Sequence, residues 1–204
     1  MCGRLASVSI EPFRLAIPSI PGFGLSGPTR EPGWEVHRMA KAFGELMDRL
    51  GDHRYGVQGG DWGAAISREL GRVRPEQVVG VHLNLLPGGG ATSEPTEQEL
   101  AALDPAERDR TIASWQQEKQ GYADLQSTRP RTLAYALVDS PVGQLAWIAE
   151  KWHEWADPAQ PIARDHLLTT VMLYWLTGTA GSAGRAYYEE FSEFGFPAGL
   201  LLHP

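Results

Sequence analysis

The run Gly59-Gly60-Asp61-Trp62-Gly63 has the residue types of a reactive turn. Apolar patterns on either side of it predict a strand before the run and a helix after it. A sharp turn from strand to helix strains the backbone, so small residues are needed around its central residue. That residue is Asp61, whose carboxylate can attack an electrophilic carbon and leave an ester on the protein. The backbone amide of Trp62 would then stabilise the oxyanion formed when the ester is hydrolysed.

The same aspartate has a simpler explanation as a helix cap. Aspartate is preferred at the N-cap position, where its side chain accepts hydrogen bonds from the first backbone amides of the helix. The glycines on both sides of Asp61 favour the reactive turn, because a cap alone does not require them. The sequence leaves both interpretations open.

A second glycine pattern, formed by Gly22, Gly24 and Gly27, matches the G-x-G-x-x-G fingerprint of dinucleotide-binding proteins. In that fingerprint a helix begins directly at the glycines and points its amides at the pyrophosphate. Here Pro28 and Pro32 delay the next helix. We therefore expect a turn-rich loop and no cofactor.

The elements that position the reactive turn can be predicted from hydrophobic periodicity and turn formers. They are, in order, a short strand at 13–17, a helix at 36–50, a strand at 55–58, a helix at 64–73 and a strand at 78–85. A strand, a helix and a strand in this order predict a parallel pair with a crossover helix. The first half of the chain is therefore expected to be α/β.

Helix signals dominate the second half of the chain. Asp104 before Pro105 and Ser140 before Pro141 are typical helix starts, and a further helix is expected over 165–175. The aromatic stripe in this half is expected to pack in its core, and it consists of Trp147, Trp152 and Trp155.

A block of helices after an α/β half is typical of a cap or lid. We expect a partial core over 1–90, a helical cap over 91–190 and the start of a return to the core over 191–204. The boundary between core and cap is expected at the Pro87-Gly88-Gly89-Gly90 linker.

The composition argues against several classes of partner. The chain of 204 residues has a formal net charge of −7, which disfavours nucleic acid because phosphate binding needs a basic face. Its one cysteine, Cys2, excludes an internal disulfide and a cysteine-based zinc site and fits a reducing cytoplasm. No apolar run approaches the roughly 18 residues that span a bilayer, so no membrane anchor is expected. No metal is expected either, because no H-E-x-x-H spacing occurs.

The run at 59–63 resembles the nucleophile turn of epoxide hydrolases in the α/β-hydrolase superfamily, specifically those of the microsomal type. The resemblance extends from about Phe13 to Tyr188. Besides the turn, it rests on the Pro-Ser-Ile-Pro-Gly-Phe-Gly loop at 18–24, the Val-His-Leu-Asn strand at 81–84 and the helical stretches at 137–143 and 165–178. It implies a partial α/β-hydrolase core of parallel strands with crossover helices, followed by a helical cap.

The resemblance also implies a mechanism. The aspartate, here Asp61, opens an epoxide by backside attack on a ring carbon. Two cap tyrosines donate hydrogen bonds to the departing oxygen, and the family pattern places them at Tyr122, after Gly121, and at Tyr187, in an Arg-x-Tyr context. Tyr188 is a rival for the second role. A histidine then activates the water that cleaves the ester to a diol. The implied partners are water and a small apolar or aromatic epoxide.

The sequence departs from the family pattern at both ends. The family's His-Gly-x-Pro turn is not found upstream, and no Gly-His pair follows the cap. None of the six histidines is expected to be the general base, and His82 is expected to lie within a strand as a core or interface residue. The chain is therefore expected to be truncated and to form the ester without hydrolysing it. Its unpaired strand edges and exposed apolar faces are expected to cause either marginal folding or self-association.

Two alternatives remain. The chain could be a catalytically inactive fragment that serves as an interaction module. It could also be similar to a haloalkane dehalogenase, which uses an aspartate at the same turn but needs halide-binding donors in place of Tyr122 and Tyr187.

Overall fold

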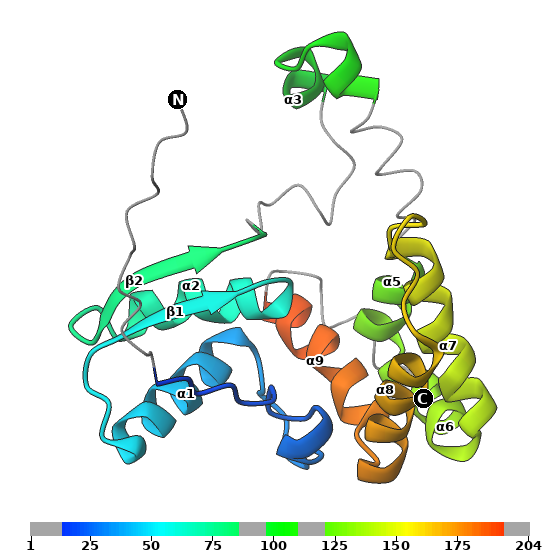
Figure 1. Ribbon diagram of the computed structural model, residues 1–204, viewed down its shortest axis with the longest axis horizontal. Coiled ribbons are helices and arrows are strands. Elements are labelled where there is room, and N and C mark those ends of the chain that lie inside the picture. Colours follow the sequence, from blue (N-terminus) through cyan, green and yellow to red (C-terminus); the bar gives the residue numbers. More distant parts are fainter. Residues whose placement is uncertain (1–13, 86–96, 110–120, 194–204) are drawn as a thin grey trace, which may run out of the picture.

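The computed structural model describes residues 14–85, 97–109 and 121–193. Its first part contains a two-stranded parallel sheet of β1 (Tyr55–Gly59) and β2 (Val78–Leu83), with helices α1 (Val36–Leu50) and α2 (Trp62–Val73). Helix α2 connects the two strands and packs against both of them and against α1 (Figure 1). The predicted strand–helix–strand order and the α/β class are confirmed.

Helix α1 forms because its apolar residues share one face. Val36, Met39 and Ala40 are buried at the spacing expected of a helix. At its start, the carboxylate of Glu35 accepts a hydrogen bond from the backbone amide of Arg38 at 2.9 Å. At its end, Gly51 takes a left-handed conformation with a φ of 79°, which glycine adopts without steric cost. These caps explain why the observed helix matches the predicted range of 36–50.

The second part consists of helices α5 to α9. Their bounds are α5 (Gly121–Thr128), α6 (Pro130–Asp139), α7 (Pro141–Trp155), α8 (Arg164–Thr177) and α9 (Ala180–Glu193). The predicted start of α7 is confirmed: the hydroxyl of Ser140 accepts a hydrogen bond from the amide of Gly143 at 3.0 Å. Between β2 and α5 along the chain there are short helices at α3 (Glu97–Ala101) and at residues 105–109. The carboxylate of Asp104 caps the latter helix, as expected.

Helix α9 joins the two parts. In Figure 1 it lies between the unit of β1, β2, α1 and α2 on one side and the group of α5 to α8 on the other. Its Ala186 is buried in one hydrophobic cluster with Met39 and Ile66. Its Ala180 is buried in a second cluster with Leu133 and Leu137. One helix therefore contributes to both cores.

Two expectations about elements are wrong. Residues 14–17 form no strand, and Leu15 and Ile17 are 76% and 86% exposed. The reason is that a strand is stabilised by pairing with a neighbour, and the described sheet contains only β1 and β2. The aromatic stripe of α7 is not uniformly core, since Trp147 packs against the second cluster whereas Trp155 is 55% exposed.

The glycine-rich segment before α1 is a loop, as predicted. Gly22, Gly24 and Gly27 all have positive φ angles, and the only regular structure among them is the short 3-10 helix η1 (Gly24–Ser26). The next helix begins only at Val36. The expected boundary at Pro87–Gly90 and residues 194–204 lie outside the described residues.

Candidate active site

The turn between β1 and α2 holds Asp61 in a strained conformation. Its φ of 49° and ψ of −127° fall outside the regions that ordinary residues populate. Among the described residues other than glycine, only Asp61 has a positive φ. A backbone of this kind costs on the order of 1–3 kcal/mol and is characteristic of functional sites.

The glycines before Asp61 are required by close packing. A Cβ atom on Gly59 would clash with the carbonyl oxygen of Gly63, and one on Gly60 would clash with the side-chain oxygen of Asn84. A Cβ on Gly63 would meet nothing. The turn is therefore made possible by the two glycines before Asp61, while the glycine after it is not sterically needed.

The carboxylate of Asp61 accepts a hydrogen bond from the backbone amide of Trp62 at 2.6 Å. The aspartate therefore does cap α2, as the simpler interpretation expected. An ordinary N-cap residue, however, has extended backbone angles and binds the second or third amide of the helix. Asp61 has neither property, so capping alone does not account for its geometry. Its side chain is exposed beside the amide that an oxyanion would need.

Aromatic side chains from three helices meet beside this turn. The ring of Tyr187 on α9 lies edge-on to the ring of Trp62, with the ring centroids 4.9 Å apart. The ring of Tyr122 on α5 lies 6.1 Å from that of Tyr187. The structure thus brings all three predicted residues into one cluster next to Asp61. Tyr188, the rival for the second role, is half-buried one position further along α9.

The environment keeps the Tyr187 phenol protonated. Burial raises the pKa of Tyr187 to about 12, and the charges of Tyr122 and Asp61 act in the same direction. Side-chain hydrogen bonds with Trp62 and Gln126 oppose this shift in the pKa. A phenol that stays neutral can donate a hydrogen bond to an oxygen that develops negative charge.

Two residues of the cluster, Gln126 and Lys151, were not predicted from the sequence. Gln126 is buried and hydrogen-bonded to Tyr187. It lies one turn after Tyr122 on α5, so helical spacing could have found it. The ammonium group of Lys151 lies over the rings of Tyr122 and Trp155, at 5.2 and 5.7 Å from their centroids. No local sequence pattern predicts the contacts of Lys151, because they form only where α7 packs beside α5.

The described histidines make their contacts elsewhere. His37 contacts Glu69 at 2.5 Å, and the ring of His166 packs edge-on against that of Trp152. His53 lies 3.8 Å from Asp48. His82 and His153 are exposed.

His82 lies within strand β2, as expected, but its side chain is exposed and is not part of the core. His203 is outside the described residues.

In the described part of the chain, no group of three or more His, Cys, Asp or Glu side chains is arranged to hold a metal ion. None of the helices described combines the length and the apolar character needed to cross a bilayer.

Known proteins share both the sequence and the architecture. A relative from Stigmatella aurantiaca (strain DW4/3-1) is 40% identical over 207 residues, which is 95% of this chain and 46% of the relative. Epoxide hydrolase 1 of Sus scrofa is 35% identical over 205 residues, 89% of this chain and 44% of that protein. The crystal structure of juvenile hormone epoxide hydrolase from the silkworm Bombyx mori superposes with a TM-score of 0.73 at 32% identity. That superposition covers 90% of this chain and 48% of the silkworm chain.

The chain spans a little under half the length of these relatives. A family model described as alpha/beta hydrolase fold matches residues 8–128, a range that includes both strands and the strained turn at Asp61. On this match, the chain belongs to the alpha/beta hydrolase fold family.

Proposed function

We propose that this chain carries the ester-forming site of an epoxide hydrolase, with Asp61 as the nucleophile. The observation that carries the proposal is the strained turn that presents the Asp61 carboxylate beside the Trp62 amide, at 2.6 Å, with the Tyr187 ring packed edge-on against the Trp62 ring. The names of the relatives from Sus scrofa and Bombyx mori support an epoxide as the substrate.

In the first step a carboxylate oxygen of Asp61 attacks a ring carbon of the epoxide from the side opposite the ring oxygen. A carbon–oxygen ester bond forms and the ring carbon–oxygen bond breaks. The ring oxygen leaves as an alkoxide and takes a proton from Tyr187 or Tyr122, and water returns that proton to the phenol. The product is a hydroxyalkyl ester of Asp61.

In the second step water cleaves the ester to release a vicinal diol. The negative charge that develops on the ester oxygen is stabilised by the Trp62 amide, which already binds this carboxylate. The water needs a general base within hydrogen-bond reach. No described histidine contacts Asp61, so we expect this chain alone to form the ester much faster than it hydrolyses it.

Intact mass measurement after exposure to an aryl epoxide tests this function. The experiment uses a Cys2→Ser background, because the single cysteine is a competing nucleophile. We expect one adduct with the mass of the epoxide, located on Asp61 by peptide mapping and abolished by Asp61→Asn. Water labelled with oxygen-18 reports hydrolysis, since cleavage of the ester leaves the label in Asp61.

The other outcomes distinguish the alternatives. An adduct from a haloalkane but none from an epoxide would favour a dehalogenase. A folded protein that forms no adduct with either reagent would contradict the proposal and favour an interaction module.

We further propose that the chain self-associates. Exposed apolar side chains of η1 and α8, including Leu25 and Leu176 at 81% and 75% exposure, line an open hollow of about 660 Å³. Contiguous exposed apolar surface of this kind favours association. Sedimentation velocity over a concentration series tests it, and a sedimentation coefficient that does not change with concentration would contradict it.

A further inference from the structure

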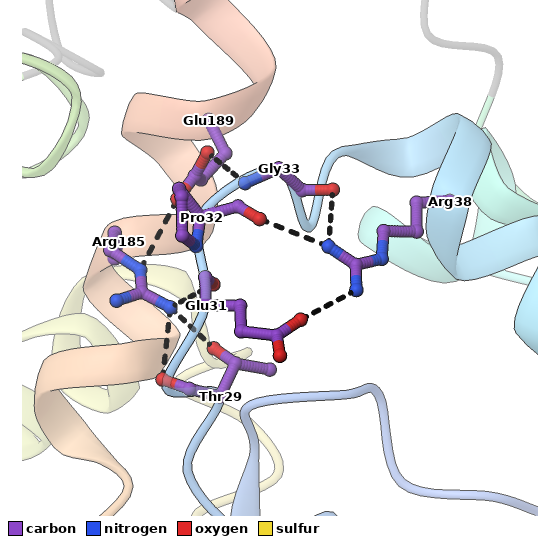
Figure 2. Close-up of polar contacts among 7 residues, drawn as sticks. All are labelled: Thr29, Glu31, Pro32, Gly33, Arg38, Arg185 and Glu189. Atoms are coloured by element: carbon purple, nitrogen blue, oxygen red, sulfur yellow. Dashed lines mark hydrogen bonds and ion pairs between the residues drawn. The ribbon is translucent and has the colours of Figure 1, made fainter.

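A line of polar contacts binds one face of α9 to the loop that precedes α1 (Figure 2). The α9 side of this line consists of Ser182, Arg185, Glu189 and Glu190, with Thr179 just before the helix. The positions from Thr179 to Glu189 recur every three or four residues, which is the spacing of one helix face, and Glu190 directly follows Glu189. Their partners lie about 155 residues earlier in the chain, between Gly22 and Val36.

Arg185 is the centre of this line. Its Nη2 group donates to the backbone oxygens of Thr29 and Glu31, at 2.9 and 2.7 Å, and to the hydroxyl of Thr29 at 3.0 Å. Its Nε group pairs with the carboxylate of Glu189 at 3.3 Å. The other oxygen of that carboxylate accepts a hydrogen bond from the amide of Gly33 at 2.7 Å. Arg185 and Glu189 therefore bind the loop as well as each other.

The loop is held from its other side as well. As Figure 2 shows, Arg38 of α1 donates to the carbonyl oxygens of Pro32 and Gly33 and pairs with Glu31. Its guanidinium group also lies 4.2 Å from the ring of Trp34. The acceptors that Arg185 binds are therefore fixed relative to α1, and α1 packs against α2.

Helical geometry connects this contact to the candidate active site. Residues two positions apart on an α-helix point in nearly opposite directions, because each residue turns the helix by about 100°. When Arg185 faces the loop, Tyr187 must face the other way, and its ring indeed lies against Trp62 and near Tyr122. The rotation of α9 about its axis that lets Arg185 bond to the loop also places the Tyr187 ring against Trp62, next to Asp61.

We propose that Arg185 and Glu189 are positioning residues that fix the rotation and height of α9, so that the phenol of Tyr187 stays beside the Asp61 turn. The proposal rests on the function proposed above for Tyr187. An arginine suits this role because its planar group can donate to several acceptors in fixed directions, which a lysine cannot do.

The test compares Arg185→Lys, Arg185→Met and Thr29→Val in the full chain. The control is Arg49→Met, which removes an exposed arginine that pairs with Glu45 within α1. The rate of adduct formation on Asp61 is measured by mass spectrometry at several concentrations of an aryl epoxide. The titration of Tyr187 is followed by phenolate absorbance, with Tyr187→Phe as the reference. Circular dichroism checks that each variant is folded.

We expect Arg185→Lys to lower the limiting rate of adduct formation about tenfold and Arg185→Met more, because a displacement of about 1 Å can cost on the order of a hundredfold. The epoxide concentration that gives half the limiting rate should change little. The Tyr187 pKa should fall from about 12 toward its ordinary value as the ring loses its buried place. Thr29→Val should lower the limiting rate less, since the two backbone acceptors of Arg185 remain. When it is combined with Arg185→Met, it should cause no further loss of rate.

Folded Arg185 variants that keep both the limiting rate and the Tyr187 titration would overturn the proposal. If Arg185→Met does not fold, Arg185→Lys and Thr29→Val decide by the same two readouts. If the unmodified chain forms no adduct, the proposed function fails, and the Tyr187 titration still decides whether Arg185 positions this ring.

Discussion

Asp61 caps a helix and is also held in a strained backbone conformation. Its carboxylate binds the first amide of α2 and so satisfies a backbone donor that would otherwise lack a partner. Its positive φ is unnecessary for that purpose and costs free energy. The strain is accommodated because Gly59 and Gly60 leave room for the carbonyl of Gly63 and the side chain of Asn84.

Tyr187 provides a prediction at the residue scale. Burial raises its pKa from 10.0 to about 12, so the folded state holds the proton between these values while the unfolded state releases it. The contribution of this pKa difference to the free energy of unfolding is fully present below pH 10. It is lost as the pH rises through about 12. We therefore expect Tyr187→Phe to change the pH dependence of the free energy of unfolding only above pH 10. Chemical unfolding at a series of alkaline pH values measures this.

Tyr135→Phe is the matched control, since the Tyr135 ring is 72% exposed. In an absorbance titration, Tyr187→Phe should remove the phenol that ionises last. An unchanged alkaline end of the titration would show that the Tyr187 ring is not held in a buried environment.

The members of the candidate site could be proposed from the sequence wherever a residue type and a local pattern coincide. Asp61 was predictable because glycines flank it between a strand and a helix. Tyr122 and Tyr187 were identified only through a family resemblance, since a lone tyrosine on a helix is indistinguishable from a packing residue. The contact of Lys151 with the Tyr122 ring depends on how α7 packs beside α5, and no local sequence signal reports such packing.

At the scale of elements, the contact between α1 and α2 contains a charged cluster as well as apolar packing. The carboxylate of Glu69 on α2 accepts from His37 of α1 at 2.5 Å, and from Arg72 at 2.7 and 2.8 Å. The hydrogen bonds from Arg72 contribute most to lowering the pKa of Glu69 to about 2, with a further contribution from His37 and opposition from desolvation. The ionised form of Glu69 is therefore the one that stabilises the folded state.

Glu69→Gln should lower the free energy of unfolding by about 1 kcal/mol at neutral pH, a modest value because Arg72 is largely exposed. The carboxylate has a depressed pKa, so its contribution is present above pH 4.5 and lost as the pH falls through about 2. The difference between the two proteins should therefore shrink below pH 4.5. Urea unfolding over this range measures it.

Glu45→Gln serves as the control for this cluster, because Glu45 pairs with Arg49 on the exposed side of α1. It should change the free energy of unfolding by less than about 0.5 kcal/mol. A Glu69→Gln effect of the same size at every pH would contradict the assignment of the ionised carboxylate as the stabilising form.

The elements that could be predicted well from the sequence are those stabilised by contacts within a single stretch of chain. Helix α1 has its apolar stripe, its cap and its terminal glycine within one stretch of chain. The predicted strand at 13–17 has no such support, because a strand exists only through pairing with a neighbour, and the described sheet offers residues 14–17 none. Helix α2 begins at Trp62 rather than at 64 because the side chain of Asp61 caps it.

At the scale of the whole molecule, α9 makes the two parts of the structure depend on each other. Ala186 is 3% exposed in the cluster of α1 and α2, and Ala180 is 6% exposed in the cluster of α6. Both are alanines at close helix contacts, where a larger side chain cannot fit without moving the helix. A larger side chain at Ala186 should therefore disturb the packing of the second cluster as well as of its own.

We expect Ala186→Leu to lower the free energy of unfolding by about 1–3 kcal/mol through overpacking. Hydrogen exchange should then show weaker protection in α1 and also in α6, because α9 transmits the displacement to the cluster of Leu133 and Leu137. Ala146→Leu on α7 adds the same atoms at an exposed position and should leave both helices protected. Loss of protection confined to α1 would show that the two parts open independently. In that case α9 would not be a rigid link, and Arg185 alone would have to keep Tyr187 in place.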